Sequence, residues 1–140
     1  MNRKITLAVI LTIIAFGVGI SVMQNAKTSE KYSEKYSGIF HLDATFYKEK
    51  KYVEIKFDDS TQKTAKVTLE IQGMEQSFQK IFTGSNFTIQ VPFDDVPKYG
   101  WKTMPVTLVV EHSEFGKIGV KTDIHNQDEQ ASKTIFSEPE

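Results

Sequence analysis

Residues 40–57, with the sequence FHLDATFYKEKKYVEIKF, carry the clearest structural signal in this chain of 140 residues. From Phe40 to Tyr47 apolar and polar side chains alternate, and the alternation resumes in YVEIKF after the charged run KEKK. A period of two is typical of a β-strand that buries one face. The charged run has the length of a hairpin connection. The stretch therefore predicts two antiparallel strands joined by a short turn.

Further stretches with the same period follow along the chain: 66–72, 75–82, 87–91, 106–110 and 118–124. Residues 75–82 alternate less well and carry Lys80 on the same face as two phenylalanines, which is typical of an edge strand. Seven strands at this spacing predict an all-β domain over 38–125. We expect an immunoglobulin-like antiparallel β-sandwich of about seven strands, with a small β-barrel as the alternative.

The last predicted hairpin turns at Glu114-Phe115-Gly116, because a glycine in the left-handed conformation closes a three-residue loop. This turn predicts Val110 opposite Val120 and His112 opposite Ile118.

An apolar run, ITLAVILTIIAFGVGISVM, occupies residues 5–23 without a single charge. A helix of that length spans roughly 28 Å, which is close to the thickness of the hydrocarbon core of a bilayer. Arg3 and Lys4 precede the run, so the positive-inside tendency keeps residues 1–4 in the cytoplasm. We expect a single-pass signal-anchor in the cell membrane, with the rest of the chain outside. A cleaved signal peptide and a secreted protein are the alternative, although signal-peptide cores are usually shorter, at ~7–15 residues.

Polar segments flank the predicted sandwich. Residues 24–37 contain a tandem SEKY at 29–36, which would place like charges four residues apart on a helix and so disfavours one. We therefore expect a polar stalk over 24–37. Residues 126–140 are polar and acidic apart from Ile135 and Phe136, which predicts an acidic flexible tail, with a final edge strand as the alternative.

The charge balance and the residue types exclude several classes of function. Of the 17 basic residues, all but Arg3 and Lys4 follow the apolar run, where 18 acidic residues outnumber them. A nucleic-acid-binding domain needs clustered positive charge instead. The chain has no cysteine, which excludes disulfides, zinc–thiolate sites and cysteine nucleophiles. The sequence also lacks a nucleophile elbow and a phosphate-binding glycine loop, so we expect no enzyme.

Two predicted strands end in a pair of aspartates, at Asp58-Asp59 and at Asp94-Asp95. Hard oxygen ligands on extracellular loops suit calcium, which needs only a weak site at millimolar concentration. Calcium is the one cofactor that the sequence suggests, provided that both loops reach the same end of the sandwich. Aspartate is also a common strand-ending turn residue, which is the simpler explanation.

The three histidines do not predict a metal site. In the predicted register His112 lies near the turn of the last hairpin and His125 at its far end, roughly 23 Å away. His41 could still join one of them, and the simplest expectation is three exposed histidines.

Residues 94–101 offer a candidate surface for a protein partner. Tyr99 and Trp101 are the residue types that most often anchor interfaces. The alternative is that both side chains fold back over the open end of the core. Asn86 begins the only N-glycosylation sequon, Asn86-Phe87-Thr88, on what would be the outer side of the membrane.

The sequence thus predicts a membrane-anchored sandwich that contacts the bilayer through 5–23 and binds a protein partner in the cell envelope, as an adaptor or accessory subunit. The alternative is an extracytoplasmic carrier of a metal or small ligand that uses the acidic loops or the histidines.

Overall fold

The computed structural model describes residues 30–138. The predicted membrane segment 5–23 and the first part of the predicted stalk lie outside this range. Within 30–138, no helix is long and apolar enough to cross a bilayer. The residues from Tyr32 onward form one compact unit.

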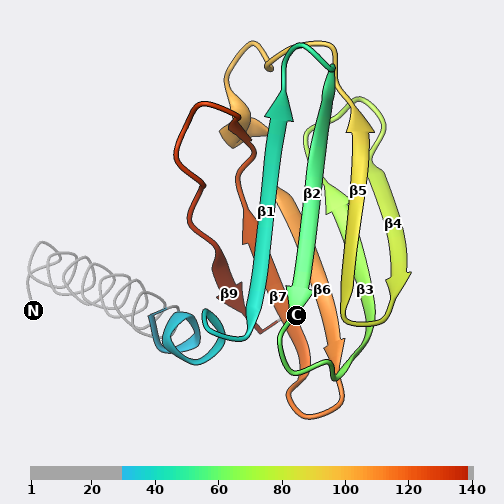
Figure 1. The fold of residues 1–140 in the computed structure, drawn as a ribbon, viewed down its shortest axis with the longest axis vertical. Coiled ribbons are helices and arrows are strands. Elements are labelled where there is room, and N and C mark those ends of the chain that lie inside the picture. Colours follow the sequence, from blue (N-terminus) through green and yellow to red (C-terminus); the bar gives the residue numbers. More distant parts are fainter. Residues whose placement is uncertain (1–29, 139–140) are drawn as a thin grey trace, which may run out of the picture. The chain divides into compact units, whose positions relative to one another are not determined.

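This unit is a β-sandwich of two sheets packed face to face (Figure 1). The first sheet has the strand order β5-β2-β1-β8, with β1 (Phe40–Tyr47), β2 (Tyr52–Asp59), β5 (Asn86–Pro92) and β8 (His125–Asn126). The second sheet has the order β4-β3-β6-β7-β9, with β3 (Thr64–Ile71), β4 (Phe78–Thr83), β6 (Val106–His112), β7 (Gly116–Thr122) and β9 (Ile135–Ser137). The predicted antiparallel sandwich is confirmed, and all seven predicted strands are present.

The alternating pattern builds the core as expected. β1 and β2 form the predicted hairpin, with Phe40 opposite Asp59 and Tyr47 opposite Tyr52. Ala44 and Ile55 are fully buried on its inner face, as are the inward residues of β3 and β6. Burying an aliphatic or aromatic side chain contributes about 1.5–3 kcal/mol, so the period of two is what drives the two sheets together.

The last hairpin differs from the predicted register by two residues. Val110 lies opposite Ile118, and His112 lies opposite Gly116. The loop is 113–115, because Gly116 adopts φ 74° as the first residue of β7 and His112 Nδ1 accepts the N–H groups of two loop residues. A shift of two residues keeps every side chain on its predicted face, so the core is unaffected.

The expectation of a stalk without helix is wrong for residues 30–36, which are helical. Tyr36 is only 6% exposed, and its ring packs against the rings of Phe40, Phe115 and Phe136. Repulsion between like charges four residues apart costs only a few tenths of a kcal/mol, which burial of one tyrosine outweighs.

The flexible tail expected for 126–140 is also wrong in part, because β9 pairs with β7. Phe136 is 2% exposed and lies against Phe40 and Tyr36. The edge-strand alternative therefore holds for residues 135–137. One large apolar side chain with a place in the core is enough to order this segment.

The two ends of the sandwich differ in their connections (Figure 1). One end, which we call the Asp59 end, has the short connections 60–63, 84–85 and 113–115. The opposite end, which we call the Trp101 end, has the connections 48–51, 72–77 and 93–105. The longest connection of these, 93–105, contains a single turn of 3₁₀-helix, η1 (Trp101–Thr103).

Candidate binding surfaces

The two aspartate pairs, Asp58-Asp59 and Asp94-Asp95, lie at opposite ends of the first sheet. Asp58 is opposite Asn86, at the start of β5, whereas Asp94 follows Pro92, which lies opposite Tyr52. Six residues along a strand correspond to roughly 20 Å, so the four carboxylates do not converge on one ion. Among the residues that the structure describes, no group of three or more histidine, aspartate or glutamate side chains is placed to hold a metal.

Asp59 has a structural role at its end of the sandwich. Its carboxylate is fully buried and accepts hydrogen bonds from Thr61 Oγ1 at 2.7 Å, Thr64 Oγ1 at 2.7 Å, and the N–H groups of Thr61 at 2.8 Å and Lys63 at 3.1 Å. Burial raises the pKa of the Asp59 carboxyl, but the hydrogen bonds from Thr61, Thr64 and Lys63 together hold that pKa below its ordinary value. Asp59 therefore orders the 60–63 turn.

His112 completes this network from the other sheet. Its Nε2 lies 2.8 Å from Thr61 Oγ1 and 3.3 Å from Asp59 Oδ2. Its Nδ1 accepts the N–H groups of Glu114 and Phe115, so Nδ1 carries no proton and Nε2 carries the hydrogen. Both ring nitrogens of His112 form hydrogen bonds within the domain, and its side chain is fully buried. His112 is therefore not available to bind a ligand.

His125 forms a second pair near the opposite end. Its Nε2 lies 2.8 Å from Asp43 Oδ1, and Thr45 Oγ1 donates to Asp43 Oδ2 at 2.6 Å. Its Nδ1 lies 2.8 Å from the carbonyl oxygen of Asn126. Both ring nitrogens of His125 therefore have hydrogen-bond partners within the domain. The expectation of three exposed histidines thus holds for His41 alone.

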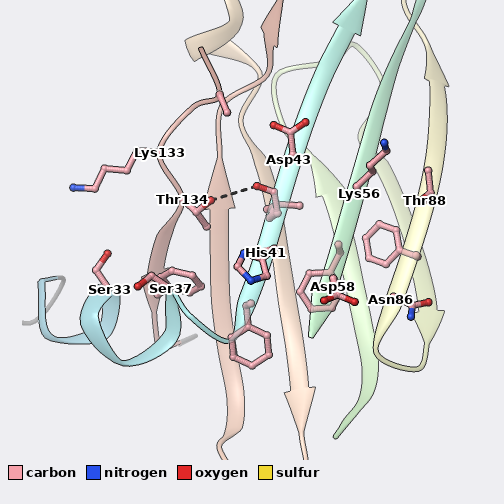
Figure 2. Close-up of a pocket in the computed structure, with 16 residues that line it drawn as sticks. Ser33, Ser37, His41, Asp43, Lys56, Asp58, Asn86, Thr88, Lys133 and Thr134 are labelled. Atoms are coloured by element: carbon pink, nitrogen blue, oxygen red, sulfur yellow. Dashed lines mark hydrogen bonds between the residues drawn. The ribbon is translucent and has the colours of Figure 1, made fainter. Parts of the chain in front are cut away.

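An open groove of about 890 Å³ lies over the outer face of the first sheet (Figure 2). Its floor consists of two cross-strand rows. The rows are His41, Asp58 and Asn86, and Asp43, Lys56 and Thr88. One wall is formed by Ser33 of the helical segment and Ser37 just after it, together with Lys133 and Thr134. The Thr134 hydroxyl donates to the carbonyl of Leu42 at 3.4 Å.

The groove has the chemistry of a polar surface. Two of its charged groups are already paired, since Lys56 lies 3.1 Å from Glu54 and Asp43 bonds His125. His41 and Asp58 face each other on the exposed side of β1 and β2. The groove can therefore donate and accept hydrogen bonds, but its lining includes no residue of the second sheet other than Phe136 to enclose a ligand.

Trp101 closes the opposite end from within. Its side chain is 8% exposed, and its ring centroid lies 5.0 Å from that of Phe46 and 5.8 Å from that of Phe93. Its Nε1–H donates to Asn126 Oδ1 at 2.9 Å. This burial excludes Trp101 as a contact residue for a partner. The side chain covers the core instead.

Tyr99 points the other way and is 80% exposed. Gly100 lies between the two aromatic residues at φ 88°, a conformation that favours glycine, and its N–H donates to the carbonyl of Pro97 at 2.9 Å. The hydroxyl of Thr103 donates back to the carbonyl of Gly100 at 2.8 Å. The loop is thus fixed on its inner side, and it presents Tyr99 and the 37% exposed Val96 to solvent.

A hollow of about 710 Å³ lies beside Val96. It is lined by Phe46, Lys48, Glu49, Val96, Asn126, Gln127 and Asp128. The hollow places charges of both signs next to an apolar residue, so it differs from a deep ligand site, whose lining is mostly apolar.

Asn86, the predicted glycosylation site, is the exposed first residue of β5. Its amide is accessible at the rim of the groove, and its modification stays a prediction.

The two histidine–aspartate pairs were not anticipated. Asp59 and His112 do carry a sequence signal, because each continues an apolar series, Asp59 after Phe57 and His112 after Val110. An acid and a histidine on inner faces must find polar partners. Asp43 and His125 carry no comparable signal, because Asp43 is on the outer face of β1.

Comparisons of the chain with protein-family models, with curated proteins and with solved structures find no match. The functional argument below therefore depends on the residues of this chain and on their geometry.

Proposed function

We propose that this protein is a single-pass, membrane-anchored binding module without catalytic activity, which displays an immunoglobulin-like sandwich outside the cell. The module contacts a protein partner of the cell envelope through the Trp101 end, as an adaptor or accessory subunit.

The strand order supports the immunoglobulin-like assignment. An immunoglobulin domain places strands A, B and E side by side in one sheet and C, F and G in the other. The order β5-β2-β1 corresponds to E-B-A, and the order β3-β6-β7 corresponds to C-F-G. β4 pairs with β3 on the far edge, which gives the second sheet its additional strand.

The observation that carries the proposal is the position of Tyr99. Within residues 30–138 it is the most exposed of the large apolar and aromatic side chains, and it lies on a loop whose inner side is packed through Trp101. A tyrosine on an ordered loop loses little conformational entropy when it binds, so this geometry favours tight contact with a partner.

The membrane location is supported by residues 5–23 together with the cationic residues before them. Residues 24–29 separate this run from the helical segment 30–36, and six residues span at most about 22 Å when fully extended.

The alternative function as a metal carrier has less support. The two aspartate pairs lie about 20 Å apart. The side chains of His112 and His125 already form hydrogen bonds within the domain.

Site-specific photocross-linking in native membranes tests the proposal. A photoreactive residue at position 99 should give a discrete cross-linked product in cells. The same residue at Ile135, which is 47% exposed on β9, is the matched control and should give none. Equal products from both positions, or none from position 99, would contradict the proposal.

The anchor is tested separately. The full-length chain should stay in the membrane after carbonate extraction, with a C-terminal tag accessible to external protease. A soluble form that begins near Ala26 would show that the signal is cleaved instead.

A further inference from the structure

The edges of the two sheets differ in how they are protected against pairing. β8 and β9 are two and three residues long, which leaves little edge to extend. β4 carries Lys80 opposite the fully buried Leu69, with its ammonium 5.4 Å from the centroid of the Phe82 ring. A lysine on the inward side of an edge strand discourages pairing with another chain.

β5 has no such lysine, and only Pro92, its last residue, limits pairing with another chain. Residues 86–92 contain no charged side chain. The N–H of Asp59 donates to the carbonyl of Ser85. This bond shows which alternate residues of β5 form backbone hydrogen bonds with β2, namely the odd-numbered ones. In an antiparallel ladder alternate residues point their backbone groups the same way, so Thr88 and Gln90 direct theirs away from β2. These groups form an unpaired template for another strand.

An incompletely covered apolar seam lies directly below this edge. Phe82 of β4 and Phe87 of β5 stack with ring centroids 3.9 Å apart and planes 4° apart. Both rings, with Phe78 and Ile89, are only partly buried against the core. A second strand beside β5 would remove this surface from water, which is favourable.

We propose that β5 pairs with β5 of a second copy of this chain, in an antiparallel register centred on Ile89. This register places Phe87 opposite Val91 of the second copy, so apolar residues meet on the inner face. It also places Thr88 opposite Gln90 of the second copy, with their free backbone groups facing each other.

The charges on the neighbouring strand are complementary in this register. Glu54 lies beside Gln90, and Lys56 lies beside Thr88. Each Glu54 therefore shares a row with Lys56 of the second copy, three strands and about 14 Å away, and β5 itself brings no like charges together. These features favour a second copy over an unrelated strand.

The experiment measures the mass of the full-length chain in mild detergent by sedimentation velocity. Wild type should be a dimer. Ile89→Lys gives β5 the same inward lysine as β4 and should raise the dissociation constant at least tenfold, whereas Ile81→Lys, on the exposed side of β4, should not. A wild-type monomer, or a dimer that survives Ile89→Lys, would overturn the proposal.

Two further variants keep the proposal testable if Ile89→Lys fails to fold. Gln90→Pro removes an N–H that points away from β2, so the domain should fold and the dimer should be lost. Because the chain has no other cysteine, Ile89→Cys should form a disulfide-linked dimer on mild oxidation, and Ile81→Cys should not. No cross-linked dimer with Ile89→Cys would count against the register.

Discussion

The Asp59 end and the Trp101 end are each closed by a buried side chain that forms hydrogen bonds within the domain. The two ends differ in which side chains they expose to solvent. At the Asp59 end the carboxylate and His112 use their hydrogen-bonding atoms on neighbours within the domain. At the Trp101 end the indole makes one internal hydrogen bond, and the loop above it exposes Tyr99 and Val96. The Asp59 end thus contributes to stability, and the exposed loop at the Trp101 end is the surface that we propose for contact.

The largest expected effect is on stability at the Asp59 end. Asp59→Ala removes the acceptor of Thr61, Thr64 and Lys63, and loss of one member of a buried charged network costs about 3–5 kcal/mol. Asp43→Ala is the matched control, because the Asp43 side chain is 42% exposed and its pair should contribute about 1 kcal/mol or less. Urea unfolding of both variants measures the difference, and equal losses would contradict the distinction.

A smaller effect is expected from Trp101→Phe. This change keeps most of the ring contacts with Phe46 and Phe93 but leaves the Asn126 carboxamide without its indole donor. Loss of the hydrogen bond and of ring volume should cost about 1–2 kcal/mol of unfolding free energy. If Trp101→Phe is as stable as wild type, the tryptophan does not fix the loop.

The pH dependence should reflect Asp59. Its pKa in the folded state lies below the ordinary value of about 3.9, so the unfolded state binds the proton first. This contribution to stability is complete above about pH 5 and is lost as the pH falls through the folded-state pKa. Unfolding free energies between pH 6 and 3 should therefore decrease less steeply in Asp59→Asn than in wild type. Identical slopes would show that other carboxylates dominate acid unfolding.

The sequence predicts the sandwich because alternation alone places each side chain on an inner or outer face. It does not fix the register of the last hairpin, because a shift of two residues leaves Val110 and Val120 facing inward. Tyr36 and Phe136 show a second limit, since each becomes ordered only by packing on Phe40, which is distant in sequence from Phe136.

The sequence identifies the aromatic loop but not which of its side chains is exposed. Tyr99 and Trp101 were identified as a pair, yet Gly100 between them turns one side chain outward and the other inward. Composition indicates that an aromatic loop exists, whereas the backbone conformation of one glycine decides which aromatic residue is exposed.

The most direct test of a contact role for the Trp101 end uses a photoreactive residue at Val96 in native membranes. Tyr99→Ala, which should change the unfolding free energy by less than about 0.5 kcal/mol, should reduce the cross-linked product at least tenfold, since an interface anchor contributes about 2 kcal/mol or more. Unchanged cross-linking in Tyr99→Ala would contradict the central claim that this end of the sandwich binds the partner.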